Sequence, residues 1–265
     1  MYTAGYLASI LIGISLGLIG GGGSILTVPV LVYLFGTDPV LATTYSLFVV
    51  GITSLAGFFT YVRKKQVNFK TGIFFGIPSI AAVLLTRKFV VPAIPEKLLH
   101  LGSFVLTRNM LLMLFFAILM IFASISMMKK SRSNRDPAAP SRHIPIGSVL
   151  LQGIGVGTVT GLIGAGGGFL IIPALVNMLK LPMKTAVGTS LFIISINSLI
   201  GFSSSFHALP VNWSFLLIVT GIAIAGLFIG SFFSARIDGA KLKPAFGWVV
   251  LLVGMYILLK ETVLI

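Results

Sequence analysis

Apolar residues occur in long runs separated by short polar segments, and a helix of about 20 such residues crosses the hydrocarbon core of a bilayer. The polar segment 129–143 has proline, serine and basic residues without an apolar period, which predicts a linker between two halves. The predicted helical elements are 2–35 (broken at 20–23), 40–62, 71–94 and 110–128, then 144–181 (broken at 164–168), 185–206, 212–235 and 246–259.

The two halves repeat one pattern. Residues 17–32 read GLIGGGGSILTVPVLV and residues 161–176 read GLIGAGGGFLIIPALV, at an offset of 144 residues. Internal repeats with glycine-interrupted helices are typical of transporters whose site lies between the halves. We therefore predict an all-α polytopic membrane protein with repeats at 1–128 and 144–265, and about eight to ten membrane helical segments in all.

Composition supports a membrane protein. Hydrophobic residues make up 57 % of the chain, charged residues only 9 %, and the mean hydropathy is +1.09. With three histidines, no cysteine and five scattered acids, we expect no metal site, no cofactor and no enzyme. The one catalytic alternative is an intramembrane pair of Ser190 or Ser204 with His207.

The basic residues predict an orientation, because lysine and arginine accumulate in cytoplasmic loops. If each glycine-broken element returns to the side on which it began, all but five of the 19 basic residues lie on one side, whereas simple crossings give no bias. This favours repeats inverted about an axis in the membrane plane, with a cytoplasmic linker at 129–143. The five expected outside are Arg87, Lys88, Lys97, Arg108 and Lys260.

The same pattern leaves one feature of the topology open. The pattern does not decide whether the broken elements are re-entrant hairpins or two crossings each. Segment 89–106, with two prolines and Glu96, predicts an external interfacial segment rather than a span. The net charge of +14 lies in short loops, which argues against a nucleic-acid partner and for anionic lipids of the bilayer.

The glycine clusters are the first candidate site. A helix cannot continue stably through several glycines, and unwound backbone at membrane depth must be buried in protein or line a polar cavity. The helix that follows each break begins with N–H groups that suit an oxyanion. The alternative is close packing or a hinge. We interpret as packing the glycines at small-xxx-small spacing, which are Gly13, Gly17, Gly21, Gly153, Gly157 and Gly161. The candidate substrate contacts are Gly20, Gly22, Gly23, Ser24, Gly164, Gly166, Gly167 and Gly168.

Polar side chains inside the next element of each half are the second candidate. Ser46 and Thr53 share a helix face, and Ser190 and Asn197 match them at the repeat offset; Thr189 adjoins this face. They would donate hydrogen bonds to an anion, or instead bond neighbouring helices or their own helix backbone.

Acidic residues are absent from the depth of every predicted span, which favours an anionic or neutral substrate. His207 is then the one candidate for proton coupling, with an interfacial histidine as the alternative.

The repeated motif GLIGxGGGFLxxPxLV, followed by a serine-leucine-phenylalanine and an NSxxGF pattern, resembles the TauE/SafE family of sulfite exporters and anion permeases. The resemblance implies a bacterial-type inner-membrane carrier of small sulfur oxyanions such as sulfite or organosulfonates. The inverted repeats predict alternating access, in which one half moves against the other around the two glycine breaks. The first copy departs from the pattern with Ser24 in place of the last glycine and Thr53 in place of the asparagine. A non-transporting membrane scaffold and a passive anion channel are the alternatives, and the oligomeric state stays open.

Overall fold

The computed structural model describes residues 2–101, 104–128, 146–177, 179, 181–206, 209–234 and 239–263. This part of the chain is nearly all helical and contains six helices long and apolar enough to cross a membrane, which confirms the predicted all-helical membrane protein. The long helices are α3 (Pro39–Arg63), α4 (Phe69–Leu85), α6 (Arg108–Met128), α9 (Met183–Ser203), α10 (Trp213–Ser234) and α11 (Gly239–Val263).

The first glycine-broken element folds into a hairpin with two arms. Its segments are α1 (Tyr2–Ile19), η1 (Gly21–Leu26), α2 (Thr27–Pro29) and η2 (Val30–Leu34). The ring of Phe35, after the return arm, lies 5.3 Å from the ring of Tyr6, near the start of α1. The element therefore finishes at the end of the bundle where it starts.

The return arm differs from the continuous α-helix predicted after the break. It begins as a 3₁₀-helix, makes one α-helical turn and ends as a π-helix, in which the Phe35 N–H donates to the Val30 carbonyl. Pro29 has no backbone N–H to donate to the carbonyl four residues earlier, which accounts for the irregular helical hydrogen bonds around it.

The second glycine-broken element is also a hairpin, formed by α7 (Ile146–Ile163), a turn at 164–167 and α8 (Gly168–Asn177). Val149, early in α7, and Leu175, late in α8, share one hydrophobic cluster. The two arms therefore open toward the same end.

The two hairpins enter the bundle from opposite ends. α1 runs in the same direction as α10, with Gly230 against the backbone of Ile14. α7 runs in the same direction as α4, with Gly161 against Thr86. The first hairpin opens at the end of the bundle where α3 begins. The second opens where α4 begins, which is the end where α3 finishes, so the two openings lie at opposite ends.

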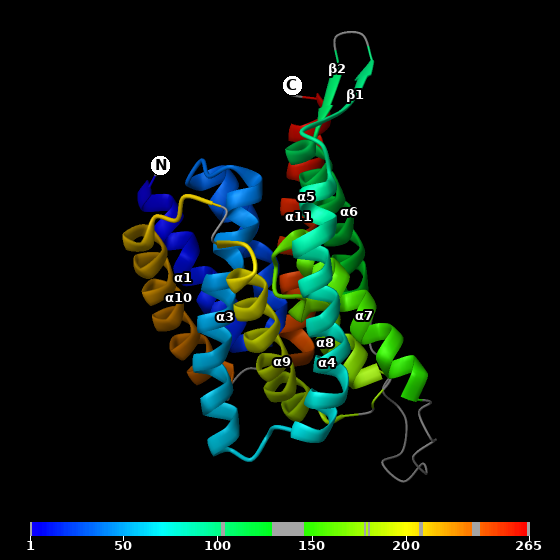
Figure 1. The fold of residues 1–265 in the computed structure, drawn as a ribbon. Coiled ribbons are helices and arrows are strands. Elements are labelled where there is room, and N and C mark those ends of the chain that lie inside the picture. Colours follow the sequence, from blue (N-terminus) through cyan, green and yellow to red (C-terminus); the bar gives the residue numbers. More distant parts are fainter. Residues whose placement is uncertain are drawn as a thin grey trace.

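Each main helix pair joins one helix from each half. α3 and α9 cross the centre antiparallel, and α1–α10, α4–α7 and α6–α11 pack around them (Figure 1). Glycines bring the paired backbones together: Gly13 contacts Ala223, and Gly157 contacts Ser79. The packing predicted for these glycines is confirmed.

The bundle is apolar outside and contains buried polar groups inside. Leu151 is 70 % exposed and Phe122 is 66 % exposed, whereas Ser46 and Asn197 are 0 % exposed. An apolar outer surface of this kind suits contact with lipid.

The segment between α4 and α6 differs from the prediction. The helix continues through η3 (Thr86–Val90) and α5 (Val91–Ala93), so the start of the expected interfacial segment is helical. An antiparallel pair of strands, β1 (Lys97–Leu101) and β2 (Phe104–Thr107), then projects beyond the helices (Figure 1). Short apolar runs do not distinguish a strand from a helix by periodicity, so the sequence prediction missed this hairpin. The predicted linker at 129–143 lies outside the described residues.

Candidate functional site

The tips of the two hairpins meet inside the bundle. A Cβ on Gly21 would lie 2.5 Å from the Gly168 Cα, and both residues are buried. Gly21 also lies beside Ile194, near the middle of α9. The two glycine clusters are thus brought together, and their contact leaves no room for a side chain or an oxyanion at that point.

The second tip has an unusual backbone. Gly164, Gly166 and Gly167 have φ values of +74°, +68° and +69°, a region that other residues rarely adopt. Gly166 faces the Ser198 hydroxyl, and Gly167 faces the Thr160 hydroxyl. Both hydroxyl oxygens are buried without a hydrogen-bond partner in the described part of the chain. This tip therefore holds unused donors beside a side-chain-free backbone.

The first tip is more self-contained. Gly20 has a φ of +75°, Gly22 lies against Met127, and Gly23 lies against Ser15. The Ser24 hydroxyl donates to the Gly21 carbonyl at 2.7 Å, so this predicted donor bonds its own loop.

The candidates on α3 and α9 separate into two groups. Thr53 donates to Val49 O at 2.6 Å, and Ser190 donates to Val187 O at 2.8 Å, so each bonds its own helix. Ser46 is buried without a partner for its hydroxyl among the described residues.

Two further candidates bond between elements. The Thr189 hydroxyl accepts the Asn68 N–H at 2.9 Å. The Asn197 Nδ2 donates to Ser79 Oγ at 2.6 Å, while its Oδ1 has no partner in the described residues. A cavity of about 80 Å³ between α4 and α9 reaches Asn197, and most of its lining is apolar. His207 lies outside the described residues.

Arg87 was missed as a candidate, because the sequence analysis counted it only among the basic residues expected on the outer side. The structure places it in η3 with only 4 % of the residue exposed. Its Nη1 donates to Thr44 Oγ1 at 3.2 Å, and its Nε and Nη2 have no partner among the described residues. The side chain is buried because η3 continues the helix, Thr44 of α3 contacts the guanidinium, and α7 packs against η3. Its place on the outer side of the membrane stays a prediction. No sequence signal distinguishes it from its exposed neighbour Lys88.

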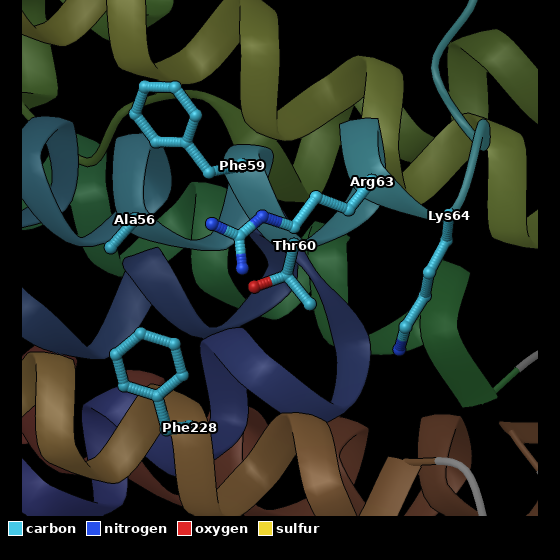
Figure 2. Close-up of a pocket in the computed structure, with 6 residues that line it drawn as sticks. All are labelled: Ala56, Phe59, Thr60, Arg63, Lys64 and Phe228. Carbon is cyan, nitrogen blue, oxygen red and sulfur yellow. The ribbon is translucent and has the colours of Figure 1, made fainter.

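A separate cavity of about 470 Å³ lies at the surface, between the last turns of α3 and α10. Figure 2 shows the side chains around it, which combine phenyl rings with two basic groups. None of them belongs to the predicted site. They are Ala56, Phe59, Thr60, Arg63, Lys64 and Phe228.

In the described part of the chain, no group of three or more histidine, cysteine or acidic residues is placed to hold a metal ion. The buried groups near the hairpin tips are hydroxyls, an amide and a guanidinium, whose N–H and O–H groups suit an anion.

These features define a multi-pass helical membrane protein with polar groups enclosed around two broken helices. A sequence profile described as "Sulfite exporter TauE/SafE" matches residues 6–257. The chain therefore belongs to the TauE/SafE family.

Its relatives are named as membrane transporters. A probable membrane transporter protein of Xylella fastidiosa is 29 % identical over 255 residues, which cover 94 % of this chain and 91 % of the relative. YunE of Bacillus subtilis, also a probable membrane transporter protein, is 28 % identical over 261 residues, which cover 89 % of this chain and 90 % of the relative. A probable membrane transporter protein of Methanocaldococcus jannaschii is 31 % identical over 228 residues, which cover 83 % of this chain and 78 % of the relative. No solved structure matches the chain at a significant level.

Proposed function

We propose that this protein is a secondary transporter for a small sulfur-containing oxyanion, such as sulfite or an organosulfonate. The observation that supports this most is the meeting of two glycine-broken hairpins, at Gly21 and Gly168, beside buried hydroxyls that have no partner in the part of the chain that the structure describes. The family description adds sulfite as the first substrate to test. The proposal assigns no catalytic step to the chain.

Transport proceeds by alternating access in this proposal. The hairpins enter from opposite ends, so separation of their tips toward one end or the other would expose the same central site to each side in turn. The contact between Gly21 and Gly168 then corresponds to a closed state in which no anion lies between the tips.

The membrane arrangement is part of the same proposal. The repeats are inverted about an axis in the membrane plane, and the segment 129–143 lies in the cytoplasm at an inner, or plasma, membrane. The support is the gathering of basic residues on one side in this arrangement.

Flux into proteoliposomes tests the function. Purified protein is expected to take up sulfite with saturation, and sulfoacetate is expected to compete more strongly than chloride. Measurement with and without a pH gradient separates a coupled carrier from a passive channel, whose flux would not saturate. Folded protein that moves neither sulfite nor sulfoacetate would contradict the proposed substrate class and favour a scaffold role.

A further inference from the structure

Arg87 is a buried cation that the bundle leaves largely unpaired. A guanidinium has five N–H donors, and the described structure gives Arg87 a single hydrogen bond, to Thr44 Oγ1. Thr44 is itself 0 % exposed. Burying a charge without partners is unfavourable, and an ionisable residue at membrane depth is by default a candidate for function.

That one bond uses the Nη1 side of the guanidinium. The Thr44 hydroxyl donates to the Val40 carbonyl at 3.2 Å, so its oxygen accepts from Arg87 Nη1. Nε and Nη2 form the opposite, unused edge of the group. The parallel N–H groups of such an edge match two oxygens of one oxyanion.

Arg87 and Thr44 lie beside the second hairpin. Thr86, adjacent to Arg87, packs against Gly161 of α7. Thr43, adjacent to Thr44, packs against Gly164 at the hairpin turn. A movement of this hairpin away from α3 and α4 would therefore change the packing directly beside Arg87 and Thr44.

We infer that Arg87 binds the transported anion, holding two of its oxygens on Nε and Nη2, with Thr44 as a positioning residue. This inference rests on the proposed function and adds a charged group that the glycine and hydroxyl candidates lack. It also predicts selectivity, because a bidentate contact favours sulfite or a sulfonate over chloride, which has a single acceptor atom.

The test measures sulfite and sulfoacetate binding to the purified full-length protein by calorimetry, with chloride as competitor. Loss of a charge-assisted bond predicts about 10-fold to 100-fold weaker sulfite binding in Arg87→Met. Arg87→Lys keeps the charge but loses the bidentate edge, so it is expected to bind about 10-fold more weakly and to prefer sulfite over chloride less. Lys88→Gln is the matched control, because Lys88 is adjacent but exposed, and its affinity should stay within about twofold.

Thermal unfolding without anion separates binding from structure. Arg87→Met removes an unpaired buried charge, so its melting temperature should equal or exceed that of the wild type. If Arg87→Met binds sulfite as tightly as the wild type does, the inference is overturned, whether flux persists or is lost. If Arg87→Met does not fold, Arg87→Lys decides, and unchanged affinity and selectivity in that variant overturn the inference.

A failure of the proposed transport function gives a different result from a failure of the Arg87 inference. Wild-type protein that shows no sulfite or sulfoacetate flux, but binds either anion in an Arg87-dependent way, would support Arg87 and contradict transport of these substrates. Wild-type protein that binds neither anion overturns the inference.

Discussion

Equivalent positions in the two repeats share their packing but differ in chemistry. At the repeat offset, Arg87 and Thr44 correspond to Ser231 and Gly188. The backbone of Ser231 packs against Gly17 of α1, as Thr86, the neighbour of Arg87, packs against Gly161 of α7. Gly188 has no side chain, and the backbone of Gln66 lies there instead. The fold repeats the helix contacts, whereas the buried cation occurs in the first repeat alone among these matched positions.

The hairpin tips show the same kind of difference. The second tip has three glycines with positive φ and faces two hydroxyls without partners among the described residues, while the first closes a hydrogen bond within its own loop. Repeat symmetry therefore explains where the elements lie, and the anion site that we propose lies where the two repeats depart from it.

The largest effect is expected where the two tips meet. In Gly168→Leu the side chain would overlap the Gly21 backbone, which cannot move aside as a side chain can. We expect destabilisation of about 3 kcal/mol and loss of sulfite flux. Thermal unfolding and proteoliposome flux measure the two effects. Gly155→Leu is the control, because a Cβ on Gly155 meets no atom within 4 Å. If Gly168→Leu melts at the same temperature as the wild type, the tight contact between the tips is contradicted.

The matched pair Arg87 and Ser231 comes next. Arg87→Met should weaken sulfite binding about 10-fold to 100-fold, whereas Ser231→Ala should change it less than about twofold. The dissociation constants for sulfite, measured by calorimetry, test this difference between the two variants. Equal losses in both variants would indicate that the repeats contribute symmetrically and that the cation has no special role.

A third comparison sets Asn197 against its counterpart Thr53. Asn197→Leu leaves the buried Ser79 without its partner and should cost about 1–3 kcal/mol of stability. Thr53→Val removes a bond to its own helix carbonyl and should cost less than about 0.5 kcal/mol. Thermal unfolding measures both. Addition of Ser79→Ala to Asn197→Leu should recover part of the loss, and no recovery would show that Ser79 is not the cause.

The smallest effect concerns the starts of the central helices. Asp38 caps α3 by accepting the Val40 N–H at 2.9 Å, and its other oxygen accepts from Asn109 at 2.7 Å. Its counterpart Pro182 caps α9 without a side-chain bond. Asp38→Ala should lower stability by about 1 kcal/mol and speed amide exchange in the first turn of α3. Pro182→Ala serves as the reference, and a larger loss in that variant would contradict the capping argument.

Much of the fold was predictable because the signals are local. Apolar runs located the long helices, and the repeat located both breaks, with the 3₁₀ and π segments around Pro29 and the β1–β2 hairpin as the departures. Glycines at regular helical spacing also predicted close backbone contacts, which Gly13 and Gly157 make.

The sequence by itself determined a duplicated, helical membrane protein with two glycine breaks, since hydrophobic pattern and glycine content act within single elements. Only the tertiary structure decided that the breaks touch, that Thr53 and Ser190 bond their own helices while Asn197 bonds Ser79, and that Arg87 is buried. Arg87 and Lys88 are adjacent basic residues with opposite exposure. The physical reason is that burial of a side chain near a helix end depends on which distant helices cover that face.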